Sequence, residues 1–245
     1  MATNRKIQKE GIVLRQTITK EADAMVDCLG PEGVFAFYAR GIGKLTSKNG
    51  ASCSALSHSI FTLIVSSNGS LSLSEAKPLE SFLPSSSDLS QFAVLSFLQE
   101  LSAKLLQDGE GEEIYPWLLQ TLKKIKEGFD PLTAGLIYFA HLLVDFGIGL
   151  DVDECIVCHK KSSIAAISYE DGGFLCKDHF QEGNGQLAGA QKLKIIRYLF
   201  RVPLEMIDKI AFEKEDALPF YKELGQYLHD QTGASLKSIS LFEKL

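Results

Sequence analysis

Two short pairs of metal-binding side chains lie in the third quarter of this 245-residue chain. Cys155 and Cys158 are separated by two residues, and Cys176 and His179 repeat that spacing after seventeen further residues. Two intervening residues allow one tight turn to present both side chains of a pair to the same ion, and thiolate and imidazole are ligands that tetrahedral zinc prefers. The pattern predicts one zinc ion with four protein ligands, which makes the site structural rather than catalytic.

The two cysteine-containing pairs have other interpretations besides a zinc site. A redox-active C-x-x-C would be expected near a βαβ pattern, which this part of the chain lacks. His159 is a spare candidate ligand, but it directly follows Cys158 and would break the paired spacing. Residues 164–175 are typical of a β-hairpin with its turn at 171–173. Because the surrounding residues include few large apolar side chains, metal binding would supply the folding free energy that they lack.

The first eighty residues are rich in alternating and β-branched side chains, which are typical of short strands. The predicted strands span residues 10–19, 22–30 and 34–43, and a hairpin within 59–77 turns at Asn68-Gly69, a favoured two-residue turn. Five short strands are buried without open edges when they close into a barrel. We therefore expect a five-stranded OB-type barrel over residues 1–80 rather than a fragment of a β-sandwich.

From Ser81 onward the apolar residues recur at helical spacing. Residues 81–88 are expected to form a linker whose serines cap the next helix. The predicted helices span 89–106, 114–128, 130–148, 190–200 and 218–233. The predicted fold is therefore α+β, with an all-helical domain over residues 81–245 that carries the zinc-binding segment as an insertion at about 151–185.

The charge of the chain is unevenly distributed. Residues 1–80 contain nine Lys and Arg against seven Asp and Glu, a net of +2, whereas residues 81–245 contain sixteen against twenty-four, a net of −8. We call residues 1–80 the head. Because the head is basic and the rest of the chain is acidic, a nucleic-acid surface, if present, is expected in the head. No apolar run approaches the roughly 18 residues of a membrane span, so no membrane association is expected. The two remaining cysteines favour a reducing, cytoplasmic setting over a disulfide framework.

Motifs of common enzyme classes are absent from the sequence. It contains no G-x-x-x-x-G-K phosphate loop, no G-x-S-x-G elbow, no H-E-x-x-H and no H-x-E tripeptide of the zinc deaminases. His141 lies in an apolar helical pattern and is interpreted as a core histidine rather than a catalytic base. The acidic stretch 109–113 is interpreted as a solvated loop. We therefore expect a binding protein and not an enzyme.

Residues 11–48 resemble the amino-terminal barrel of the RecO family of bacterial recombination mediators. The family pattern is G-x-V-L, then E-A-D, then G-x-x-x-x-x-A-[KR]-G, followed by basic residues. These motifs fall on Gly11, Val13, Leu14, Glu21, Ala22, Asp23, Gly33, Ala39, Arg40, Gly41 and Lys44. The family's closing L-K-S matches residues 236–238, and the zinc pattern resembles the family finger in place and spacing. Two departures are the histidine at position 179, where the family usually has a fourth cysteine, and a less basic loop after Gly41.

The resemblance implies a mediator of DNA repair and homologous recombination. Proteins of this family bind single- and double-stranded DNA, anneal complementary strands and work with RecR. They recognise the acidic carboxyl tail of single-strand-binding protein and help to load RecA onto coated DNA. The resemblance also implies a cytoplasmic, nucleoid-associated protein of bacterial origin.

An OB barrel binds single strands through a basic groove that contains aromatic stacking platforms. The candidate DNA-binding residues of this chain are Arg15, Tyr38, Arg40, Lys44 and Lys48. Strand alternation places Phe35 and Phe37 on the face opposite Tyr38, where we expect them to belong to the barrel core. An ordinary solvated surface is the alternative interpretation of the four cations.

A second group of cations lies on the predicted helix 190–200 and just after it. Lys194, Arg197 and Arg201 follow i, i+3, i+7 spacing and therefore share one helix face. This face is a candidate dock for an acidic partner tail with apolar terminal residues, a DNA contact or a solvated surface. Two other functions were considered, a zinc-dependent DNA-binding transcription regulator and an enzyme with a structural zinc. The regulator would need a basic helix beside the finger, but residues 151–190 have a net charge of −4.

Overall fold

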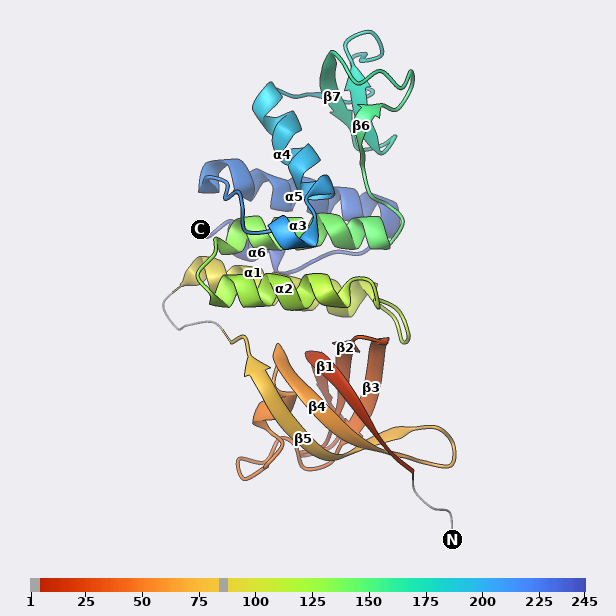
Figure 1. Cartoon of the computed structure of the whole chain (residues 1–245), viewed down its shortest axis with the longest axis vertical. Helices are drawn as coiled ribbons and strands as arrows, with labels where there is room; N and C mark the ends of the chain where they lie inside the picture. The colour runs from red at the N-terminus through yellow and green to blue at the C-terminus, as the bar shows by residue number, and fades with distance from the viewer. Residues whose placement is uncertain (1–4, 84–87) are drawn as a thin grey trace. The chain divides into compact units, whose positions relative to one another are not determined.

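The computed structural model describes residues 5–83 and 88–245. The chain divides into two compact units, Met1–Glu127 and Gly128–Leu245 (Figure 1). The described part of the first unit contains a β-barrel and two helices, and that of the second unit contains helices and a small sheet. None of the described helices is both long enough and apolar enough to cross a bilayer.

The barrel of the first unit is built from strands that all lie within the described residues. These strands are β1 (Arg5–Ile18), β2 (Ala24–Gly30), β3 (Gly33–Ala39), β4 (Ser57–Val65) and β5 (Leu71–Ser81). Their order is β1-β2-β3-β5-β4, and β4 pairs with β1 to close the barrel. All neighbouring pairs are antiparallel except β3 and β5, which run parallel and meet at Tyr38 and Ser72. The predicted strands of the head are therefore present.

Aromatic side chains fill the barrel interior. In β3 the buried and half-buried residues alternate, so Phe35 and Phe37 point inward and Tyr38 points outward. The ring of Phe37 lies 4.9 Å from that of Phe61 on β4. The prediction that Phe35 and Phe37 are core residues is confirmed. Cys53 is buried in the same core, and desolvation raises the pKa of its thiol to about 12.

Two of the barrel hairpins, β2–β3 and β4–β5, have different turns. Gly30 pairs with Gly33 at the first hairpin, where Gly33 adopts φ +87° and where a Cβ would lie 2.8 Å from the backbone of Gly109. In the second hairpin the prediction of a two-residue turn is wrong. The Ser66 N–H donates to the Ser70 carbonyl, so the loop has three residues, and the last of them, Gly69, has φ +83°. A left-handed residue at that position is typical of a three-residue loop.

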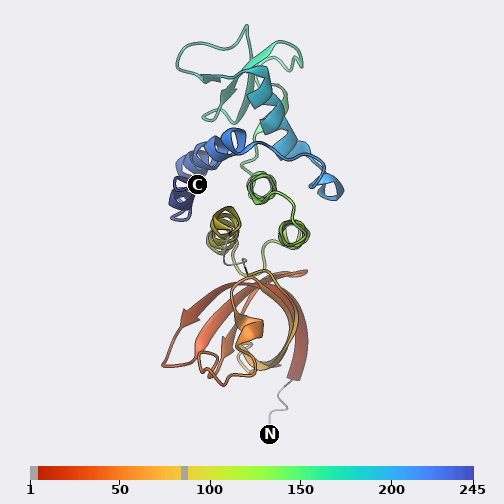
Figure 2. The same ribbon diagram turned by 90° about the vertical axis from the view of Figure 1, so that its left-hand side faces the viewer.

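Helices α1 (Leu89–Leu105) and α2 (Tyr115–Lys126) belong to the same compact unit as the barrel and are seen nearly end-on in Figure 2. The carboxylate of Asp88 caps α1 by accepting from the Gln91 N–H at 3.0 Å. The serines expected to provide that cap are at positions 85–87, outside the described residues. The Gln99 side chain of α1 donates to the Leu14 carbonyl of β1 at 2.8 Å.

A buried polar network connects α2 to the barrel. The Tyr115 hydroxyl donates to Glu10 of β1 at 2.7 Å, and Nε2 of His58 on β4 lies 2.8 Å from the same carboxylate oxygen. The Tyr115 bond, followed by His58, lowers the pKa of Glu10 although burial opposes this shift. These contacts place α2 with the barrel, whereas the sequence suggests a domain boundary after residue 80. That boundary stays a prediction.

The second unit is organised around helix α3 (Pro131–Asp145), which is buried along most of its length. Asp130 caps α3 by accepting from the Thr133 N–H at 2.6 Å, and Pro131 occupies its first position, as expected. His141 of this helix is half-buried, and desolvation lowers its pKa to about 4. At neutral pH it is therefore an uncharged side chain of the helical core.

The other helices of the second unit are α4 (Ala190–Arg201), α5 (Lys214–Thr232) and the short α6 (Ile239–Phe242). The Tyr221 hydroxyl of α5 donates to the Leu132 carbonyl of α3 at 2.8 Å, and its ring stacks on Phe242 at 3.8 Å. The sequence predicts that α5 begins at 218, but it begins at Lys214 with Pro219 inside the helix. An acidic first turn suits the positive end of the helix dipole and accompanies this earlier start.

Candidate functional site

The predicted metal ligands lie at one edge of the small sheet in the second unit. Its strands are β6 (Asp151–Cys155), β7 (Ile164–Ser168), β8 (Gly173–Cys176) and β9 (Gln186–Leu187), in the order β6-β8-β7-β9. Strands β6 and β8 are parallel neighbours, so Cys155 and Cys176, their last residues, lie at the same end of the sheet. The predicted hairpin of β7 and β8 is present, whereas β6 and β9 were not anticipated.

Each pair of ligands is formed by a strand end and the tight turn that follows it. After β6 the His159 N–H returns to the Cys155 carbonyl at 2.8 Å, and after β8 the His179 N–H donates to the Cys176 carbonyl at 3.1 Å. The first turn places Cys158 back beside Cys155, and the second does the same for His179 and Cys176. The C-x-x-C and C-x-x-H spacings therefore produce two similar turns that face each other.

The four side chains converge in the geometry of a tetrahedral site. The ligand atoms of Cys155, Cys158, Cys176 and His179 all lie within 4.8 Å of one another. The Sγ atoms of Cys158 and Cys176 are 3.8 Å apart, and the Cys155 Sγ is 3.7 Å from the His179 Nδ1. A tetrahedral zinc with Zn–S bonds of about 2.3 Å separates its sulfur ligands by about 3.8 Å. These residues could therefore hold one zinc ion.

The spare histidine does not join this cluster. His159 is exposed, and its Nδ1 lies 2.7 Å from a carboxylate oxygen of Glu154. It also adopts φ +60°, a left-handed conformation that directs the chain out of the turn. His179 is therefore the imidazole of the cluster, as the paired spacing predicts.

The electrostatics at Cys155 favour the form of sulfur that binds metals. Desolvation raises the pKa of the Cys155 thiol, but backbone N–H groups, first that of Cys176 and then that of Val157, outweigh it and lower the pKa to about 6. This shift favours the thiolate, which is the state that a metal ion requires. The apolar core around the cluster is small, since Ala166 and Leu175 are its main fully buried members besides the cysteines.

The cationic face of α4 is coupled to this sheet by ion pairs. Arg197 and Arg201 lie 3.2 and 3.0 Å from the two carboxylate oxygens of Asp153 on β6, and both side chains remain about half exposed. Lys194 is exposed and takes part in no ion pair within the described residues. The three predicted cations therefore share one helix face, but a carboxylate that the sequence did not indicate neutralises part of their charge.

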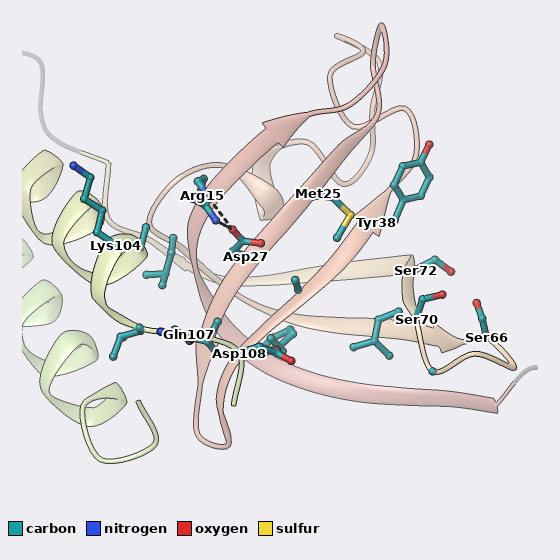
Figure 3. A pocket seen from close by; sticks show the side chains of 18 residues that line it. Arg15, Met25, Asp27, Tyr38, Ser66, Ser70, Ser72, Lys104, Gln107 and Asp108 are labelled. Carbon is teal, nitrogen blue, oxygen red and sulfur yellow. Dashed lines mark hydrogen bonds and ion pairs between the residues drawn. The ribbon is translucent and has the colours of Figure 1, made fainter. Parts of the chain in front are cut away.

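In the first unit a groove of about 870 Å³ crosses the outer face of the barrel. It is lined by residues of β1, β2 and β3, by the loop between β4 and β5 and the start of β5, and by the carboxyl end of α1 with residues 106–108. Figure 3 shows Tyr38 and Met25 towards the end near that loop, and Arg15 paired with Asp27 nearer α1. The Arg15 Nη2 lies 2.6 Å from the Asp27 carboxylate, so its charge is largely balanced within the groove.

The remaining candidate cations lie outside the groove lining. Arg40, Lys44 and Lys48 are exposed on the segment between β3 and the 3-10 helix η1 (Ala51–Cys53), and they form no ion pairs within the described residues. The groove is also lined by three polar residues at and after the carboxyl end of α1, Lys104, Gln107 and Asp108, which the sequence does not indicate. The sequence assigned them to a different domain from the barrel, so no pattern in the head could have indicated them.

Family comparisons cover both units. The model described as "Recombination protein O N terminal" matches residues 1–82, and the one described as "Recombination protein O C terminal" matches residues 86–239. Proteins named "DNA repair protein RecO" from Bacillus cytotoxicus, Bacillus mycoides and Bacillus cereus are each 28% identical over 239 residues. Each alignment covers 96% of this chain and 96% of the relative.

Proposed function

Because this chain belongs to the RecO family of DNA repair proteins, we propose that it binds single- and double-stranded DNA and anneals complementary strands during homologous recombination. The observation that carries this proposal is the groove across β1, β2 and β3 of a barrel closed in the order β1-β2-β3-β5-β4. OB-fold barrels bind oligonucleotides on the face of their second and third strands. We assign the barrel to that class.

In this proposal the two groups of candidate residues have different roles. Tyr38 offers a half-buried ring on the groove wall for base stacking, and Arg15 contributes a guanidinium that Asp27 orients. Arg40, Lys44 and Lys48, which form no ion pairs within the described residues, supply the positive charge that phosphates require. Because these cations follow directly after the strand that carries Tyr38, one DNA strand could contact both groups.

The metal and the partners are proposed on the same basis. One structural zinc ion, bound by Cys155, Cys158, Cys176 and His179, would stabilise the sheet of the second unit. The protein would work with RecR, recognise the acidic tail of single-strand-binding protein and thereby help to load RecA, in the cytoplasm and in association with the nucleoid. It would act by binding rather than by catalysis.

DNA binding is expected to tolerate changes of sequence and to fall steeply with salt, because neutralised phosphates release counterions. If the three loop cations each neutralise one phosphate, the slope of log K against log salt should be about −2 for single strands and about −3 for duplex. Fluorescence anisotropy with DNA of unrelated sequences measures the sequence tolerance and the salt slope. A strand-annealing assay on the same samples tests whether the protein anneals complementary strands. A strong preference for one duplex sequence would instead support a transcription regulator.

The α4 face gives a second prediction, for the partner tail. Arg197→Glu combined with Arg201→Glu is expected to weaken binding of an acidic peptide with apolar terminal residues, since each surface cation contributes about 1 kcal/mol or less and reversal adds repulsion. Asp153→Asn is expected to strengthen it, because the substitution releases both arginines from their shared carboxylate.

Titration of a fluorescent tail peptide against the parent and these variants measures the effect, with thermal melting to verify that the sheet remains folded. Equal affinities in all proteins would exclude this face as the dock. If the double arginine variant also loses binding of short naked DNA, the face contacts DNA instead of the tail.

A further inference from the structure

Two segments distant in the sequence are joined at one end of the barrel. The turn between β1 and β2 contains Ala22 and Asp23, and the segment after β3 contains Gly41 and Gly43. The Gly41 N–H donates to the Asp23 Oδ1 at 2.7 Å, and the Gly43 N–H donates to the Ala22 carbonyl at 2.9 Å. The other oxygen of Asp23, Oδ2, accepts from the Tyr38 hydroxyl. We refer to these three hydrogen bonds as the Asp23 latch.

The latch fixes the backbone at the position where the basic loop leaves β3. Arg40 precedes Gly41, and Lys44 donates its N–H back to the Gly41 carbonyl at 3.3 Å to close a turn. Gly41 has φ +66°, a conformation that other residues adopt only with strain. Because the amides of Gly41 and Gly43 are held by Asp23 and Ala22, the backbone between Arg40 and Lys44 is fixed while both side chains remain exposed.

The charge of Asp23 is at first sight unfavourable in this position. Its carboxylate lies close enough to Arg40 and Lys20 for both to stabilise its ionised form, and the Tyr38 hydrogen bond, followed by that of Gly41, lowers the pKa of Asp23. An ionised carboxylate beside a phosphate-binding loop repels DNA. The geometry offers a compensating role, since both carboxylate oxygens hold groups of the proposed DNA surface.

We propose that Asp23 is a positioning residue for DNA binding, which acts by pre-organising the loop that carries Arg40 and Lys44 and by fixing the Tyr38 ring. The inference rests on the proposed function and extends it to a residue of the wrong charge to contact DNA. Ordering the loop in advance removes conformational entropy that binding would otherwise lose. Loss of the latch should therefore weaken DNA binding by about threefold to tenfold.

The sign of the effect separates this role from simple electrostatics. Asp23→Ala removes one negative charge, so a Coulombic role predicts tighter DNA binding, whereas a positioning role predicts weaker binding. Glu21→Ala is the matched control, because it also removes one negative charge and lies only two residues before Asp23. The Glu21 side chain is exposed and has no partner within the described residues. The control should bind DNA as the parent does or slightly more tightly.

Two milder variants test the individual hydrogen bonds. Tyr38→Phe keeps the ring for stacking and the net charge but removes the hydroxyl donor, so it should weaken binding less than Asp23→Ala. Asp23→Asn retains an acceptor for the Gly41 N–H and should likewise lie between the parent and the alanine variant. If Asp23→Ala fails to fold, Tyr38→Phe is the deciding variant. If it melts like the parent and binds DNA with the parent's affinity, the proposed positioning role of Asp23 is wrong.

The measurement is anisotropy of a labelled single strand at fixed ionic strength, with thermal melting of every variant. Weaker binding by Asp23→Ala beside unchanged or tighter binding by Glu21→Ala is the expected result. Equal or tighter binding by Asp23→Ala overturns the inference while leaving the proposed function intact. A parent protein that binds no DNA would overturn the proposed function, and this inference with it.

Discussion

Replacing Cys176 with alanine is expected to unfold the small sheet of the second unit and to lower the thermal stability of α4 and α5 with it, while the barrel of the first unit keeps its own transition. The apolar core beside the four ligands is small, so the end of the sheet that carries them depends on the metal for folding free energy. Binding of structural zinc supplies about 10–16 kcal/mol in isolated fingers, and loss of one of four ligands removes a large share of it. The Tyr169–Glu223 hydrogen bond of 2.7 Å, which ties the sheet to α5, should be lost at the same time.

Zinc content and melting together test this prediction. The parent should contain one zinc per chain after careful purification, and a strong chelator should reproduce the behaviour of the Cys176 variant. His159→Asn is the matched control, since it alters an exposed imidazole beside the site, and asparagine accepts the left-handed conformation at that position. Substoichiometric zinc in the parent, or a Cys176→Ala protein that melts like the parent, would contradict a structural metal site.

Reversing the charge of two loop cations, Arg40→Glu with Lys44→Glu, is expected to weaken binding of both single- and double-stranded DNA by more than tenfold. The substitutions remove two phosphate contacts and add repulsion, so the salt slope should become shallower by about 1.4 for single strands and about 1.8 for duplex. Anisotropy titrations over a range of salt concentrations measure the affinity and the slope together.

The control for this pair has to reproduce the change in net charge at another place. Lys160→Glu with Lys161→Glu does so on two exposed residues of the second unit, in the turn between β6 and β7. If the loop variant and this control weaken binding equally, net charge rather than the barrel surface determines affinity. If the loop variant keeps the parent's affinity and slope, the DNA surface lies elsewhere.

Features that depend on neighbouring residues could be predicted from the sequence. The spacing of Cys155, Cys158, Cys176 and His179 specifies two turns, and each turn forms within a few residues of the chain. The strands of the barrel and the cap of α3 at Asp130 follow from alternation and from side-chain chemistry in the same way. Local patterns of this kind predict which helices, strands and turns form, but not which of these elements pair or pack together.

The contacts that modify the candidate sites lie between distant residues, and no local pattern indicates them. Arg15 is balanced by Asp27 on the next strand, and Arg197 by Asp153 on a strand 44 residues earlier. Nothing in the sequence distinguishes Asp27 or Asp153 from other acidic residues, and only the register of the strands and the docking of α4 bring them within ion-pair distance. The parallel pairing of β6 with β8 is likewise invisible in the sequence, although it brings the two ligand pairs together.

The junction between β3 and β5 affects how the barrel opens. Within the described strands these two are in register at Tyr38 and Ser72, whereas the antiparallel neighbours are paired along most of their length. Local opening of a protein begins where the fewest hydrogen bonds have to break. Amide hydrogens along this junction should therefore exchange with solvent sooner than those of the β1–β4 and β4–β5 pairs. Because Tyr38 and Ser72 both line the groove, the surface proposed to receive DNA should also be the part of the barrel that opens most readily.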